Sequence, residues 1–177
     1  MQETVVSVGI EEAYAQLKAA LLQNNCTITA EQAPKNLKIK QGSLWGISPK
    51  TAQKTVFFRL SQDGSETQIK SNSSLSPDYV KLTVAGCIFA VTLALLCAWI
   101  SLDLAGFAAS QKPSFWSWLT EAGGYVDTQG AILLSNLTRV FAVFLAVTLA
   151  LEAFVVAYVR SKINVFAEEI LKKVPSG

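Results

Sequence analysis

The sequence predicts an α+β protein that continues into a membrane. An N-terminal domain with the order β-α-β-β-β-β precedes a two-helix transmembrane hairpin and an amphipathic C-terminal helix. Two observations predict this class: strand and helix patterns alternate before residue 80, and two long apolar runs follow. The chain is 51% hydrophobic and 16% charged with a net charge of +2, which excludes intrinsic disorder. The expected parts are a domain at 1–79, a first span at 80–102, an outer loop at 103–131, a second span at 132–159 and an inner tail at 160–177.

The first domain has the pattern of one helix on an antiparallel sheet. Residues 10–24 carry apolar side chains at helical spacing, while residues 27–31, 36–40 and 54–61 alternate between apolar and polar in the manner of strands. Strands are also expected at 3–8 and 67–71. Asp63-Gly64 is a hairpin signal between the last two strands. A single helix can cover one face of such a sheet.

The two spans follow from length and polarity. Residues 82–102 are 21 residues without a charge, which make a helix of roughly 32 Å, the thickness of a hydrocarbon core. The second run, 140–159, contains a single charge, Glu152. The outer loop, 103–131, holds Lys112 against three acids, whereas the tail holds four Lys or Arg against two acids. By the positive-inside rule we expect a cell-membrane protein with both termini cytoplasmic.

The outer loop and the tail contain recognisable local signals. Ser114 is expected to cap a short helix, and Trp116 and Trp118 are expected at the membrane interface. Asp127 or Thr128 is expected to cap the second long helix, and Arg160 marks its inner boundary. Without a breaker before Pro175, the second span is expected to continue inward as one helix. The apolar stripe of this tail could pack on the first domain, which we favour, lie on the membrane or bind a partner.

Glu152 is the residue in the spans that most needs an explanation. A carboxylate at the bilayer centre costs about 2.5–3.5 kcal/mol on insertion scales. It could snorkel to the headgroups, be protonated or hydrogen-bonded against a partner helix, or take part in ion or proton movement. Thr148 lies four residues earlier on the same helix face. We favour a partner helix that contacts Thr148 and Glu152.

Small residues recur at every fourth position of both runs, which allows close helix packing. The predicted packing residues are Gly86, Ala90, Ala94 and Ala98 on the first span and Ala142, Ala146 and Ala150 on the second. If the spans pack through these stripes, Glu152 faces a third helix from another subunit. The alternative is that alanine is simply common in membrane helices.

Trp45 lies in the most distinctive loop of the first domain, between Gly42 and Pro49. It could dock on lipid or a partner, or it could close the end of the sheet's core, which we favour. The loop lacks the Gly-Lys-Ser/Thr ending of a phosphate loop. Chemistry is otherwise sparse: the chain has no histidine, and its three cysteines have no metal or disulfide spacing. We therefore expect no catalytic residues, no metal and no cofactor, and no nucleic-acid partner.

The pattern over residues 3–75 resembles known arrangements. A helix after the first strand, the Trp45 loop and the strand 54–60 followed by an Asp-Gly turn resemble a shortened helix-grip or START-like domain. The chain also looks like small uncharacterised prokaryotic two-span membrane proteins. The expected function is a non-catalytic accessory or scaffold subunit of a larger membrane complex, with other subunits and the lipid bilayer as partners. The alternatives are a membrane-tethered domain that binds a small ligand or lipid, and a small homo-oligomeric channel or transporter.

Overall fold

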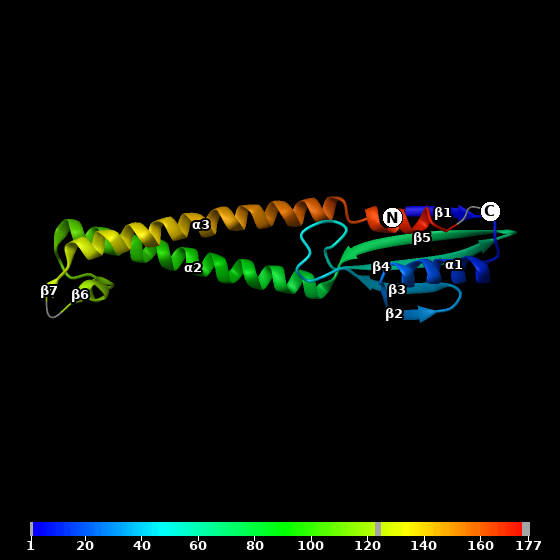
Figure 1. Ribbon diagram of the computed structural model, residues 1–177, viewed down its shortest axis with the longest axis horizontal. Coiled ribbons are helices and arrows are strands. Elements are labelled where there is room, and N and C mark those ends of the chain that lie inside the picture. The colour runs from blue at the N-terminus through cyan, green and yellow to red at the C-terminus, as the bar shows by residue number, and fades with distance from the viewer. Residues whose placement is uncertain (1, 123–124, 175–177) are drawn as a thin grey trace. The chain divides into compact units, whose positions relative to one another are not determined.

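The structure, a computed structural model, describes residues 2–122 and 125–174 (Figure 1). It is α+β, as the sequence predicts, with one five-stranded antiparallel sheet and two long apolar helices among these residues. The chain divides into two compact units. The sheet unit contains the residues up to Thr83 together with those from Phe154 onward, and the helical unit contains Val84–Ala153.

The sheet has the strand order β1-β5-β4-β3-β2, and every neighbouring pair is antiparallel. In β4 alternate residues from Lys54 to Leu60 are buried, because successive side chains of a strand point to opposite faces. The turn from β4 to β5 contains Gly64 at φ +61°, a backbone angle that glycine adopts without steric cost. The elements of this part are β1 (Gln2–Val6), α1 (Ile10–Gln23), β2 (Thr27–Gln32), β3 (Asn36–Gln41), β4 (Lys54–Asp63) and β5 (Glu66–Leu75).

The core of the sheet unit lies between one face of the sheet and two helices, α1 and α4 (Val165–Leu171). Helix α1 buries four side chains at helical spacing: Ala13, Tyr14, Leu17 and Leu21. Helix α4, together with Val174 three residues after its end, adds five residues to the same cluster: Phe166, Ala167, Ile170, Leu171 and Val174. The favoured prediction that the tail packs on the first domain is therefore confirmed. The compact unit consequently includes the C-terminal segment as well as the first 79 residues.

The tail differs from its prediction in one respect, because it is not a continuation of the second long helix. Helix α3 ends at Ser161, and residues 162–164 form a turn before α4 begins at Val165. No proline or glycine causes this break. The turn allows α4 to change direction and to place Phe166 and Ile170 in the core, where their burial stabilises the break.

The two long helices, α2 (Pro77–Ser110) and α3 (Thr128–Ser161), each have 34 residues and are long and apolar enough to cross a membrane. Both extend beyond the predicted spans. Their large apolar side chains are exposed, including Phe89 and Phe154 at 70% and Leu95 at 67%. A core helix of a soluble protein would have buried these side chains.

Within the helical unit, the less exposed positions of both helices recur alternately every three and four residues. On α2 they include Cys87, Ala90, Ala94, Cys97, Ser101 and Leu104, and on α3 they include Ala131, Ser135, Thr138, Ala142, Leu145, Leu149 and Glu152. Ser135 donates a hydrogen bond of 2.8 Å to the Ser101 carbonyl, so these faces meet. We call these two faces the seam. This repeat is the heptad geometry of packed helices.

The predicted packing residues of the two alanine stripes differ in exposure. Ala90, Ala94 and Ala98 of α2 and Ala142 of α3 are half-buried, whereas Gly86, Ala146 and Ala150 are exposed. Four helical residues turn through 400°, so a stripe of every fourth residue drifts about 40° per step away from a straight line. The seam positions recur every 3.5 residues on average. A stripe of every fourth residue therefore coincides with the seam for only one or two turns, and its other members are exposed.

Asp103 organises the loop that joins the long helices. Its carboxylate accepts hydrogen bonds from the Ser114 hydroxyl at 2.6 Å and from the Trp116 backbone amide at 2.8 Å. The sequence suggested that the Ser114 side chain caps a helix. In the structure this side chain is bound to Asp103 instead. The short helix is the 3-10 turn η1 (Ser117–Thr120), followed by the strand pair β6 (Glu121–Ala122) and β7 (Tyr125–Val126). Asp127 caps α3 as predicted, because its carboxylate accepts a hydrogen bond of 2.9 Å from the Gly130 amide.

Candidate functional site

Both long helices join the sheet unit at one small apolar cluster. Tyr79 on the first turn of α2, Val159 near the end of α3 and Ala52 before β4 are all buried and in contact. The Tyr79 hydroxyl donates a hydrogen bond of 3.1 Å to the Gly46 carbonyl. We call this cluster the junction. It holds the loop of residues 42–53 against the base of both helices.

The loop carries Trp45 outward, which contradicts the favoured prediction that this side chain closes the core. Trp45 is 81% exposed and Ile47 is 74% exposed. Phe166 of α4 instead lies in the core, with its ring centre 5.0 Å from the Lys54 ammonium. Contact with lipid or with a partner, the other interpretation of Trp45, stays a prediction.

The loop backbone is closely packed although its tip is exposed. Gly42 has φ +94°, and a Cβ at either Gly42 or Gly46 would clash with the backbone of Thr51 and Ala52. Ser43 and Ala52 form a backbone bridge, and the hydroxyls of Ser48 and Thr51 lie 2.8 Å apart. The tip therefore projects from a well-defined base.

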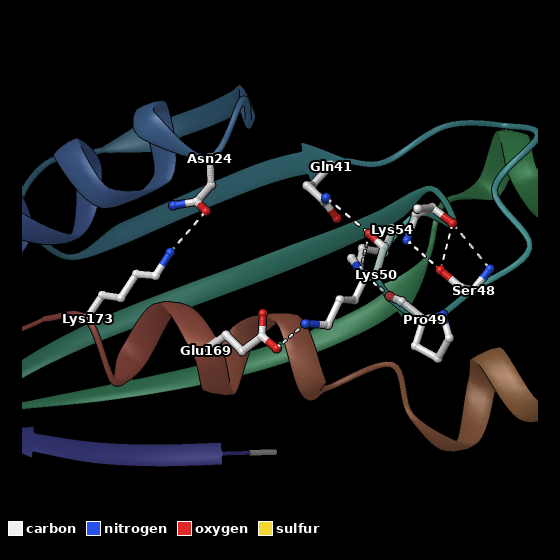
Figure 2. Close-up of polar contacts among 9 residues, drawn as sticks. Asn24, Gln41, Ser48, Pro49, Lys50, Lys54, Glu169 and Lys173 are labelled. Atoms are coloured by element: carbon white, nitrogen blue, oxygen red, sulfur yellow. Dashed lines mark hydrogen bonds and ion pairs between the residues drawn. The ribbon is translucent and has the colours of Figure 1, made fainter.

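Lys54 is a buried cation that we did not single out from the sequence (Figure 2). Only 1% of the residue is exposed. Its ammonium donates hydrogen bonds to the carbonyls of Pro49 and Lys50, and it lies 5.0 Å from the centre of the Phe166 ring. Burial lowers the pKa of Lys54 to about 8, although the Cys26 thiol and the Glu169 carboxylate oppose that shift. Burial also raises the pKa of Cys26 to about 11.

Lys54 belongs to a set of contacts that fasten the tail to the loop and to α1. The Lys50 ammonium forms an ion pair of 2.6 Å with Glu169 on α4, and the Lys173 ammonium donates to the Asn24 amide oxygen at 3.3 Å (Figure 2). Both of these contacts are exposed and contribute little by themselves. The buried Lys54 contact is different, because an unsatisfied ammonium there would be costly. The alternation of β4 indicated this burial, since Lys54 shares a face with Val56 and Phe58.

Among residues 2–122 and 125–174, no helix packs on the opposite face of the sheet, and this face carries several cations. Lys38, Arg59 and Lys70 lie on this open face around Phe57, which is 41% exposed. Lys38 is opposite Phe57 in the β3–β4 register, and Arg59 is directly opposite Lys70 in the β4–β5 register. A shallow hollow of about 390 Å³ beside Phe57 is lined by Lys38, Thr55, Asn72, Ser74, Leu75 and Pro77.

The predicted partner residues of the second span differ in exposure. Glu152 is half-buried on the seam, where its carboxylate is close enough to Cys87 of α2 to interact with the thiol. Thr148 is exposed, and its hydroxyl donates to the Phe144 carbonyl of its own helix at 2.9 Å. Contact of Thr148 and Glu152 with a third helix from another subunit stays a prediction. The 3.5-residue seam brings Glu152 inward and leaves Thr148 outside.

The predicted interface residues have mixed environments. Trp116 is half-buried, with Trp99 and Phe115 packed around it at ring-centre distances of 5.4 and 5.0 Å. Trp118 is 59% exposed, and Arg160 is exposed at the end of α3. Arg139, which we did not weigh from the sequence, is exposed one residue before the second apolar run. These residues flank the apolar runs, which is the usual position of aromatic and cationic anchors.

The fold and these surfaces define an α+β protein with two long, apolar, exposed helices. Comparison with protein-family models, with curated proteins and with solved structures found no match for this chain.

Proposed function

We propose that this chain is a non-catalytic accessory or scaffold subunit of a larger membrane complex. The observation that carries the proposal is the exposure of apolar side chains along α2 and α3. Soluble monomers rarely expose apolar patches larger than a few hundred Å². Lipid tails are the environment in which two such helices, with their backbone hydrogen bonds satisfied internally, are stable.

The docking of α4 supports a topology with both ends on one side of the bilayer. Because Phe166 and Ile170 lie in the same core as β1 and α1, the chain must return to the side from which it departed. Arg160 and Lys162 follow the second apolar run directly, while the loop between the runs is acidic overall. The positive-inside rule then places the sheet unit in the cytoplasm.

The open face of the sheet is the surface that we assign to the partner subunit. Arg59 and Lys70 face each other across the β4–β5 register, and like charges directly opposite are destabilising. The Glu3 carboxylate offsets this repulsion only in part, since its oxygen lies 3.7 Å from the Lys70 ammonium nitrogen. Within the described residues, no ion pair reaches Lys38 or Arg59. An acidic surface of the partner would relieve the repulsion and cover Phe57.

Gentle detergent extraction of the native protein followed by mass spectrometry tests this function. We expect a defined partner subunit to co-purify with the wild-type chain and with Lys172→Glu, a control at an exposed position directly after α4. Arg59→Glu should lose that partner, because the substitution reverses a charge on the open face and not elsewhere. A chain that purifies only as a homomer would refute the scaffold role, and a chain that alkaline carbonate releases from membranes would refute the membrane location.

A further inference from the structure

We infer that the Trp45 loop inserts its tip into the headgroup region of an anionic lipid bilayer and thereby seats the sheet unit on the membrane surface. This inference rests on the proposed membrane location, and it adds a lipid contact outside the two helices. The tip consists of Leu44, Trp45 and Ile47, which are 36%, 81% and 74% exposed. An exposed tryptophan next to aliphatic side chains is the composition of an interfacial anchor.

The junction places this tip at the level of the bilayer boundary. Gly46, which lies between Trp45 and Ile47, accepts a hydrogen bond from Tyr79. Tyr79 precedes the first residue of the charge-free run, Leu82, by three residues, or about 4.5 Å of helix. Val159, the last residue of the second apolar run, contacts Tyr79 in the same cluster. Both runs therefore meet the aqueous side at one level, and the loop is attached at that level.

Charge around the junction selects an anionic lipid surface. Lys81, Arg160 and Lys162 are exposed near the ends of the two apolar runs, within the sheet unit. Each Lys or Arg close to an anionic membrane surface contributes about 1 kcal/mol to attraction. Lys50 in the loop is instead paired with Glu169 at 2.6 Å.

The tip is pre-organised for this contact. The clashes that a side chain would make at Gly42 or Gly46 show that the base of the loop is tightly packed against Thr51 and Ala52. Insertion consequently requires little ordering of the backbone, which is the usual entropic cost of binding. A flexible apolar loop would lose part of its affinity to that cost.

Fluorescence of single-tryptophan variants of the full chain in vesicles tests the inference. The variant Trp99→Phe, Trp116→Phe, Trp118→Phe leaves Trp45 as the reporter. The matched control adds Trp45→Phe and Val5→Trp. Val5 is 47% exposed on β1. It pairs with Gln68 of β5, which pairs with Ser61 of β4. Ser61 is seven residues, or about 23 Å of strand, from Lys54, which follows the Trp45 loop. A third variant retains only Trp99, which lies inside the first apolar run.

The vesicles contain phosphatidylcholine and phosphatidylglycerol, with part of the phosphatidylcholine brominated near the headgroup. We expect Trp45 emission to be quenched by brominated lipid and shielded from aqueous acrylamide, and the Val5→Trp reporter to show the opposite. Quenching of Trp45 no stronger than that of the control, with Trp99 quenched, would overturn the loop inference alone. An unquenched Trp99 would overturn the membrane location itself. Equal quenching of Trp45 without phosphatidylglycerol would overturn the role assigned to the cations.

Discussion

Substitution of Ile170 in α4 should destabilise the core of the sheet unit, although Ile170 is remote in sequence from α1 and the strands that it packs against. Ile170 is 1% exposed, in the cluster formed by α1, α4 and the sheet. Ile170→Ala removes three carbon atoms, which is about 2.4 kcal/mol of lost transfer free energy at about 0.8 kcal/mol each. The remaining cavity adds to this cost, and buried Ile→Ala changes fall within about 2–5 kcal/mol. We expect a loss of about 3 kcal/mol, which is close to a 100-fold rise in the open population.

The buried thiol of Cys26 provides the assay, because this residue is 7% exposed in the same cluster. In a Cys87→Ala, Cys97→Ala background in detergent micelles, the labelling rate of Cys26 reports opening of the core. Ile170→Ala should raise that rate by about 100-fold. Lys172→Ala, two residues along on an exposed position, should change it by no more than about twofold. A rate in Ile170→Ala equal to that of Lys172→Ala would refute the docking of α4.

The same thiol assay and the outer loop allow two further predictions. Because burial lowers the pKa of Lys54 from 10.5 to about 8, the unfolded state binds more protons between these values, and the free energy of unfolding should rise with pH from 8. Above pH 9 the raised pKa of Cys26 opposes this rise, so the test lies between pH 8 and 9. Urea unfolding is run at several pH values, and the unfolded fraction is then read by a Cys26 labelling pulse at one fixed pH. The free energy of unfolding should rise with pH in wild type and not in Lys54→Met. A rise that persists in Lys54→Met would contradict the assignment of this pH dependence to Lys54. Asp103→Ala removes the acceptor of the Ser114 and Trp116 hydrogen bonds and should increase acrylamide quenching of a single Trp116 reporter, whereas Glu121→Ala should not.

The sequence by itself determined the local elements and the two apolar helices. The alternation of residues 54–61 specifies a strand, and the charge-free stretch from Leu82 to Leu102 specifies a helix for which water is a poor solvent. Such patterns depend on neighbours a few residues apart, so they can be interpreted without the fold. The burial of Lys54 belongs to this group in part, because its position in the alternation directs it to the core.

Tertiary structure decided which surfaces are free. The core of the sheet unit is completed by α4, which is remote along the chain, whereas Trp45 is exposed. The partners that make a buried Lys54 tolerable, the Pro49 carbonyl and the Phe166 ring, likewise come together only in the fold. Glu152 and Thr148 share a face by sequence spacing, but the position of the neighbouring helix leaves Glu152 half-buried on the seam and Thr148 exposed. Local periodicity cannot contain this information, because it arises from contacts between segments that are remote along the chain.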